Sequence, residues 1–200
     1  MTMTISRLRN PLTLAVLALV VAPCLPAQEA VLELDPAQTH IEFTLGEVFH
    51  PVQGTFKLKS GTIRFDPATG KARGLVVVEV ASGESDNRSR DRKMLKDVLE
   101  SQKYPEATFT PVRVYGRVEA QGESPIELDG ILKLHGNEHD LTLATTVRMD
   151  GGRLTASTHF VIPYVEWGLK NPSTLFLRVG NQVGIDVNAE GRITMPAAPR

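Results

Sequence analysis

The chain has little cysteine and no concentrated charge of either sign. Cys24 is the only cysteine among 200 residues, so the chain cannot form an internal disulfide. Lys and Arg number 22 against 23 Asp and Glu, and no long run of either sign occurs. Nucleic-acid binding needs a concentrated basic surface, so we expect no nucleic-acid partner. For the same reason, the composition gives no support to a charged surface that binds membranes.

Long hydrophobic runs are also missing, apart from one near the N-terminus. Arg7 and Arg9 precede an uncharged apolar run over residues 12–22, which is about half of the ~20 residues needed to cross a bilayer. This pattern predicts a secretory signal peptide over residues 1–27, with cleavage after Ala27 and export to the periplasm or the medium. Lipidation of Cys24 is the alternative. A lipoprotein signal has a small residue just before the cysteine, and Pro23 at that position disfavours lipidation.

Residues 28–200 are expected to form one exported domain. This length fits a single domain with a sizeable core, and without cysteine that core must hold the domain together alone. We find no internal repeat, low-complexity segment or interdomain linker in it.

Most of this domain shows the alternation of apolar and polar residues that is typical of half-buried β-strands. Residues 40–46, for example, place Ile41, Phe43 and Leu45 on one face. The same reasoning predicts strands over residues 31–34, 53–59, 62–65, 75–80, 108–118, 126–135, 140–149, 154–162, 174–179 and 183–194, with a turn at Ser60 and Gly61. The short turns between them leave no room for crossover helices, which indicates up-and-down antiparallel connectivity.

Residues 84–111 depart from the strand pattern. They predict one short amphipathic helix that ends before Tyr104 and Pro105. Its capping residues are Ser85, Asp86 and Asn87, and its apolar face consists of Met94, Leu95, Val98 and Leu99. A helix inserted among antiparallel strands is expected to cover an edge or to plug one end of a β-barrel.

His135 and His139 are spaced as two zinc ligands would be on a helix, but here they flank a turn between strands. If the loop has an even number of residues, His139 points inward and His135 outward. The two rings then diverge, so we expect no metal. We also find no nucleophile elbow and no phosphate-binding glycine loop, and therefore expect no catalytic residues, no cofactor and no enzymatic activity.

Two polar or aromatic features invite a functional interpretation. Arg90, beside Asp91 at the start of the helix, either forms a structural ion pair or lies at the barrel mouth and meets a ligand headgroup. The loop around Trp167, the only tryptophan, is either a packing cluster or a gate over an apolar cavity.

The order of several motifs resembles that of the YceI-like, polyisoprenoid-binding family. These motifs are LDPAQTHIEF at 34–43, HPVQGTF at 50–56, GTIRFDP at 61–67, NRSRD at 87–91, KYP at 103–105 and LKLHG at 132–136. The resemblance covers nearly all of residues 28–200. It implies an all-β, lipocalin-like antiparallel barrel whose elongated apolar cavity holds an isoprenoid-type lipid, either a polyisoprenoid or a quinone-like molecule.

Inward positions of successive strands are the candidate ligand contacts. We predict that the cavity is lined by Phe43, Phe56, Phe109, Leu132, Leu143 and Phe160, and that its mouth is formed by His50, Arg90 and Trp167. The expected function is that of a soluble lipid carrier or sequestering protein with at most transient membrane contact. A structural or partner-binding barrel without lipid and a hydrolase remain alternatives, and a homodimer stays open.

Overall fold

Antiparallel strands dominate the computed structural model, which describes residues 29–46, 51–119, 121–173 and 179–196. The expected signal peptide, including Cys24, lies outside the described residues. Within the described ranges the strands are β1 (Ala30–Leu34), β2 (His40–Leu45), β3 (Val52–Phe65), β4 (Ala72–Glu84), β5 (Glu106–Tyr115), β6 (Gly122–Leu134), β7 (Asn137–Asp150), β8 (Arg153–Ile162) and β9 (Val183–Thr194). The helical segment between β4 and β5 consists of α1 (Arg88–Lys93) and a π-helical turn, η1 (Met94–Val98).

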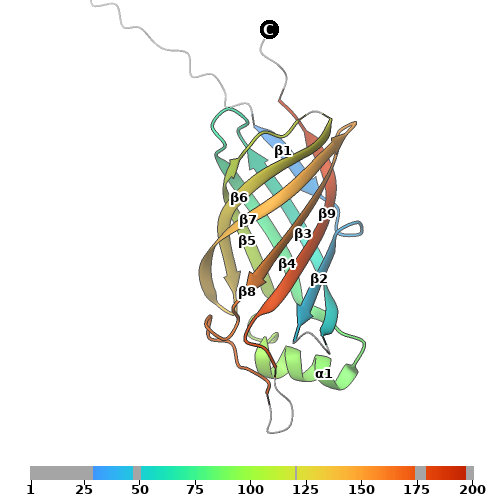
Figure 1. Ribbon diagram of the computed structural model, residues 1–200, viewed down its shortest axis with the longest axis vertical. Helices are drawn as coiled ribbons and strands as arrows, with labels where there is room; N and C mark the ends of the chain where they lie inside the picture. Colours follow the sequence, from blue (N-terminus) through green and yellow to red (C-terminus); the bar gives the residue numbers. More distant parts are fainter. Residues whose placement is uncertain (1–28, 47–50, 120, 174–178, 197–200) are drawn as a thin grey trace, which may run out of the picture.

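The strands close into a barrel because every strand pairs on both sides. From β3 to β9 each strand is hydrogen-bonded to the next in the chain, and both β1 and β2 pair with β3 and β9. β1 and β2 therefore share one position in the sheet, which gives a closed eight-position barrel (Figure 1). The all-β antiparallel fold and the up-and-down connectivity expected from the sequence are confirmed. Closure removes the exposed sheet edges that favour aggregation.

Alternation along each strand separates the interior from the solvent. In β7 every second residue from Leu143 to Met149 is buried, whereas the residues between them are exposed. The buried side chains form two clusters. One contains Phe65, Met149, Leu154 and Ile193 and lies toward the end of the barrel opposite α1, while the other surrounds Phe43 and Ile185 toward α1.

The turn predicted at Ser60 and Gly61 is wrong, because β3 runs through these residues without interruption. Gly61 serves a tertiary contact: a Cβ atom there would lie 2.6 Å from Cδ1 of Leu34. The pairing of β3 with β4 shifts register between Leu58 and Ser60, just before Gly61. The strand predicted over residues 174–179 falls outside the described residues except for Val179, which is not in a strand.

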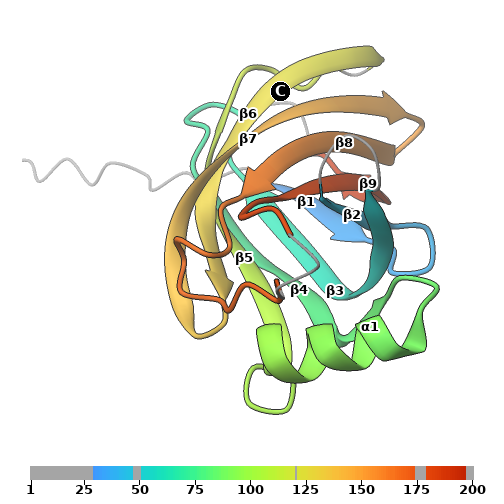
Figure 2. The ribbon, with the colours of Figure 1, turned by 60° about the horizontal axis from the view of Figure 1, so that its bottom comes forward.

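The short amphipathic helix between strands is confirmed, and it lies across one end of the barrel (Figures 1 and 2). It begins at Asn87, whose side-chain oxygen accepts hydrogen bonds from the backbone N–H groups of Ser89 and Arg90. It ends at Leu99, earlier than the predicted stop before Pro105, because Glu100 takes a left-handed conformation with φ of 46°. No helix in the described residues is long and apolar enough to cross a membrane.

Candidate functional site: an apolar cavity with a cationic end

The barrel encloses a cavity of about 900 Å³ that receives side chains from all nine strands. All six residues expected at inward positions line it, namely Phe43, Phe56, Phe109, Leu132, Leu143 and Phe160. The rings of Phe43 and Phe56 lie with their centroids 5.3 Å apart and their planes tilted by 43°. The volume falls within the range of ~300–1,000 Å³ that is usual for ligand pockets.

Strand register explains why these residues meet. Phe109 is paired with Leu132 across β5 and β6, and Leu128 with Leu143 across β6 and β7. Directly opposed residues point to the same face of a sheet, so each pair projects into the barrel.

Two glycines that the sequence interpretation missed make room for aromatic rings. A Cβ atom at Gly54 would lie 2.4 Å from Cζ of Phe43, and one at Gly130 would lie 2.3 Å from Cζ of Phe109. Each ring therefore lies against the bare backbone of its neighbouring strand. The sequence signal was an isolated glycine inside a strand pattern, which marks a close approach but does not identify the approaching group.

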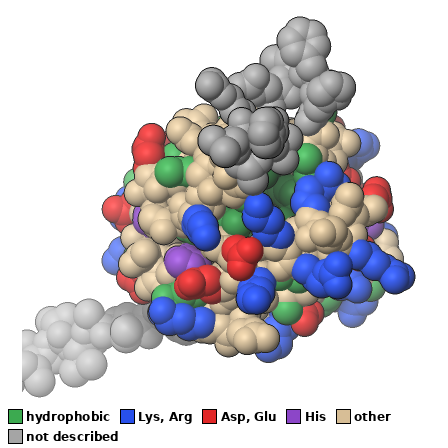
Figure 3. Space-filling view, turned by 90° about the horizontal axis from the view of Figure 1, so that it is seen from below, with side chains coloured by type: hydrophobic (Ala, Val, Ile, Leu, Met, Phe, Trp, Pro, Cys, Tyr) green, Lys and Arg blue, Asp and Glu red, His purple; other side chains and the backbone are tan. Residues whose placement is uncertain are grey.

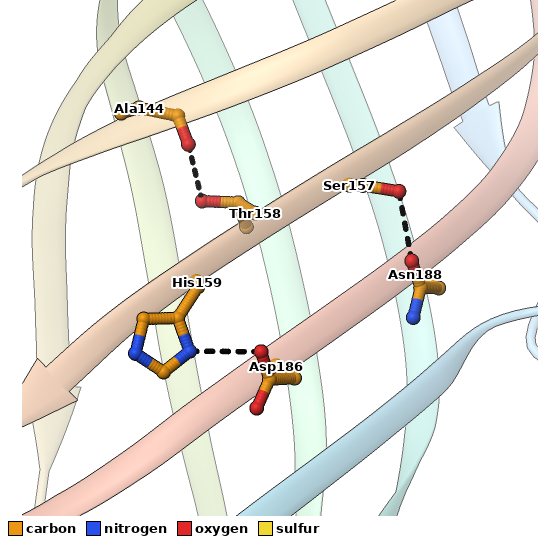
Figure 4. A network of polar contacts seen from close by, with 6 residues as sticks. All are labelled: Ala144, Ser157, Thr158, His159, Asp186 and Asn188. Carbon is orange, nitrogen blue, oxygen red and sulfur yellow. Dashed lines mark hydrogen bonds and ion pairs between the residues drawn. The ribbon is translucent and has the colours of Figure 1, made fainter.

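The threonine hydroxyl groups along the cavity wall are already engaged by the protein backbone. The hydroxyl of Thr145 donates to the carbonyl of Leu143 at 3.2 Å, and that of Thr158 donates to the carbonyl of Ala144 at 2.9 Å (Figure 4). Thr39 accepts from the backbone N–H of Glu190 at 3.3 Å. The wall therefore offers a guest little beyond apolar contact.

The outer wall carries the polar partners of the same strands. His159 Nδ1 lies 2.8 Å from Asp186 Oδ1, and Ser157 donates to Asn188 at 2.7 Å (Figure 4). These are cross-strand pairs of β8 and β9, and His159 and Asp186 are about half exposed. None of these four residues lines the cavity.

Charge enters the cavity lining only at the helical end. Within the part of the chain that the structure describes, Arg90 and Lys93 of α1 are the charged residues that line it, and no acidic residue does. Ser85 holds Arg90 in place, because its hydroxyl accepts from Nε at 2.8 Å and its carbonyl accepts from Nη2. The same hydroxyl donates to Asp91. Lys93 donates to the carbonyl of Pro172 at 3.3 Å.

The two histidines of the β6–β7 hairpin point to different partners. The hairpin turns through His135 and Gly136, and His139 lies opposite Leu132 on the inward face, as expected for an even loop. His135 Nε2 forms a hydrogen bond with Glu100 at 3.0 Å, which connects the hairpin to the end of the helix. Among the described residues no group of three or more His, Cys, Asp or Glu could hold a metal ion.

Trp167 stacks on His139, with the ring centroids 3.8 Å apart, and does not itself line the cavity. Its loop still contributes to the lining through Tyr164 and Leu169, which are buried. Burial raises the pKa of the Tyr164 phenol, which donates to the carbonyl of Gly180 at 2.6 Å. His50, the third residue expected at the mouth, lies outside the described residues.

The family model of the YceI-like domain matches residues 32–191. None of the curated proteins matches the sequence. Several solved structures share the fold at low sequence identity, and these similarities show only that the fold is the same.

BcnA of Burkholderia cenocepacia is 18% identical with a TM-score of 0.64, and the match covers 81% of this chain and 99% of that protein. A polyisoprenoid-binding domain from Saccharophagus degradans, implicated in plant cell wall breakdown, is 16% identical with a TM-score of 0.64 and coverage of 82% and 98%. The YceI protein of Campylobacter jejuni is 23% identical with a TM-score of 0.57 and coverage of 73% and 86%.

Proposed function

The chain belongs to the YceI-like domain family, and from this premise we propose that it is an exported protein that binds an isoprenoid-type lipid in its barrel and carries or sequesters it. The guest is a polyisoprenoid or a quinone-like molecule with a long apolar tail. The polyisoprenoid-binding domain from Saccharophagus degradans, which shares the fold, supports this class of ligand.

The observation that carries the proposal is the chemistry of the cavity wall. A space of about 900 Å³ is surrounded by Val, Leu, Ile and Phe side chains, and its threonine hydroxyls are bonded to backbone groups. An apolar chain loses no hydrogen bonds on entering such a space, whereas a polar guest would leave its own groups unpaired. The wall therefore selects for a hydrocarbon tail.

The hydrophobic effect can supply the affinity without specific polar contacts. Each methylene removed from water contributes roughly 0.8 kcal/mol, so each five-carbon unit contributes roughly 4 kcal/mol before the cost of ordering the chain. Several such units are enough for tight binding.

We propose that the barrel binds its guest without chemical conversion. Among the described residues, the ionisable groups of the lining are Arg90, Lys93 and Tyr164, and none of the lining residues is acidic. Burial raises the pKa of the Tyr164 phenol, whereas general acid–base catalysis requires a positioned group that exchanges protons near neutral pH. The His159–Asp186 pair lies on the outer wall and faces solvent.

Mass spectrometry of an organic extract from the purified protein tests this function. We expect a co-purifying lipid with a repeating five-carbon fragmentation pattern. The proposal fails if the extract contains no such lipid and the purified protein also takes up neither a polyprenol nor a long-chain quinone from detergent solution.

A further inference from the structure

The helical segment that crosses the barrel end is strongly cationic on its solvent side. Residues 88–96 contain five Lys or Arg, namely Arg88, Arg90, Arg92, Lys93 and Lys96, and all five are exposed. The one acid among them, Asp91, is partly buried and accepts a hydrogen bond from the Ser85 hydroxyl. Asp97 of η1 is exposed, so the helical segment presents five exposed cations and one exposed acid to solvent. The segment thus directs its positive charge outward, although the charge of the whole chain is nearly balanced.

The cations fall into two sets with different positions. Arg88, Arg92 and Lys96 recur every four residues, which places them in one stripe along the helix. None of the three lines the cavity, and the ion pairs of the described residues do not include them. Arg90 and Lys93, by contrast, line the cavity.

The stripe therefore lies on the same end of the molecule as the cationic end of the cavity. Figure 3 views this end and shows Lys and Arg side chains beside hydrophobic side chains, with a few Asp and Glu side chains among them. A buried apolar cluster occupies the interior toward the opposite end. A partner that binds the stripe consequently lies next to the charged end of the cavity.

We propose that the stripe of Arg88, Arg92 and Lys96 docks this end of the barrel onto an anionic phospholipid bilayer. Lipid phosphates complement a row of exposed cations, and each Lys or Arg near a negatively charged bilayer adds a comparable increment of attraction. Three to five such groups give reversible attachment, as a transient carrier requires. The helix lies on the membrane surface, and the cavity faces the bilayer. A role of this docking in moving a lipid between the bilayer and the cavity rests on the proposed function, whereas the docking itself does not.

Co-sedimentation with vesicles tests the docking. The full chain is compared with the triple variant Arg88→Glu, Arg92→Glu, Lys96→Glu on vesicles of phosphatidylcholine with about one third phosphatidylglycerol. The control variant is Lys71→Glu, Arg117→Glu, Arg192→Glu, which makes the same charge change at the opposite end of the barrel. None of these six residues lines the cavity, and residues 1–28 are the same in all three proteins.

We expect the parent and the control to sediment with anionic vesicles, and the helix variant to bind roughly 100-fold more weakly. Added salt should release the parent because the attraction is screened. Circular dichroism should show all three folded. Equal sedimentation of the parent and the helix variant, or equal binding of the parent to pure phosphatidylcholine, would overturn the proposal.

The docking proposal and the proposed function fail separately. Vesicle binding is measured without reference to a guest, and the organic extract is analysed without vesicles. If the purified protein contains lipid but does not bind anionic vesicles, the proposed carrier function stands and the docking proposal fails.

Discussion

The imidazole of His139 and the indole of Trp167 are stacked, with centroids 3.8 Å apart and planes 6° from parallel. The stack joins the start of β7 to the loop that follows β8, a contact across more than twenty residues of chain. His139 Nε2 is buried and has no hydrogen-bond partner among the described residues. The ring therefore stabilises the loop by packing, and its buried nitrogen carries a cost.

Replacing His139 should separate these two effects. We expect His139→Phe to raise the free energy of unfolding by about 1–3 kcal/mol, because the stack persists and the unpaired nitrogen is removed. His139→Ala should lower it by about 0.5–1.5 kcal/mol or more through loss of the stack. Thermal denaturation followed by circular dichroism measures both. If His139→Phe destabilises the protein as much as His139→Ala, the nitrogen forms a bond that contributes to stability.

Leu143→Trp tests whether the apolar interior is a ligand space. Leu143 lies mid-strand in β7, away from the helix and the Trp167 loop, and lines the cavity. The indole should occupy the volume of the guest, so we expect loss of co-purified lipid with an unchanged melting temperature. In a filled core the same change would cost about 1–3 kcal/mol of stability.

Ala144→Trp is the matched control for that experiment. Ala144 is exposed on the outer wall beside Leu143, so an indole there should leave both lipid content and stability unchanged. A large loss of stability in Leu143→Trp, together with no lipid in the parent, would favour a structural barrel.

Asn87→Ala should loosen the helix at the end of the cavity. The side chain of Asn87 caps α1 by accepting from two backbone N–H groups, both at 3.1 Å, so its loss should cost about 1 kcal/mol. We expect faster hydrogen exchange in residues 88–99 and faster release of bound lipid, with the barrel strands unaffected. Asn87→Asp keeps an oxygen acceptor and should behave like the parent, and identical exchange in both variants would show that the cap contributes nothing.

Export predicts a defined N-terminus. Intact mass measurement of protein from the periplasm or the medium should give a chain that begins near Gln28. A folded exported chain that still begins at Met1 would refute the signal peptide, and a chain that begins at an acylated Cys24 would show the lipidated alternative.

Removal of metal should have no effect on the protein. His135 bonds to Glu100 and His139 stacks on Trp167, so their rings do not converge on one ion. We expect the same melting temperature with and without EDTA, and no stoichiometric zinc by elemental analysis. One zinc per chain that is lost on replacing either histidine would contradict this interpretation.

Much of the cavity wall was predictable from local sequence because a strand repeats every two residues. Once residues 40–46 are recognised as a strand, Phe43 must share a face with Ile41 and Leu45, and the apolar face must turn inward. The helix was predictable for a similar reason, since Met94 and Val98 recur at its period and Asn87 supplies its cap. The helix end was not, because it depends on the left-handed conformation of Glu100, which contacts His135 of a distant hairpin.

Contacts between segments far apart in the chain were decided only by the tertiary structure. Gly61 resembles a turn residue in the sequence, but it lies within β3, where Leu34 occupies the space of its missing side chain. The stacking of Trp167 on His139 also requires two segments that are distant in the chain to come together. Arg88, Arg92 and Lys96 are visible in the sequence as ordinary surface charges. They form a surface beside a cavity only because the closed barrel has α1 across its end. The barrel closes because β1 and β2 pair with β9. These strands are about 150 residues apart in the chain, so no local sequence pattern encodes their pairing.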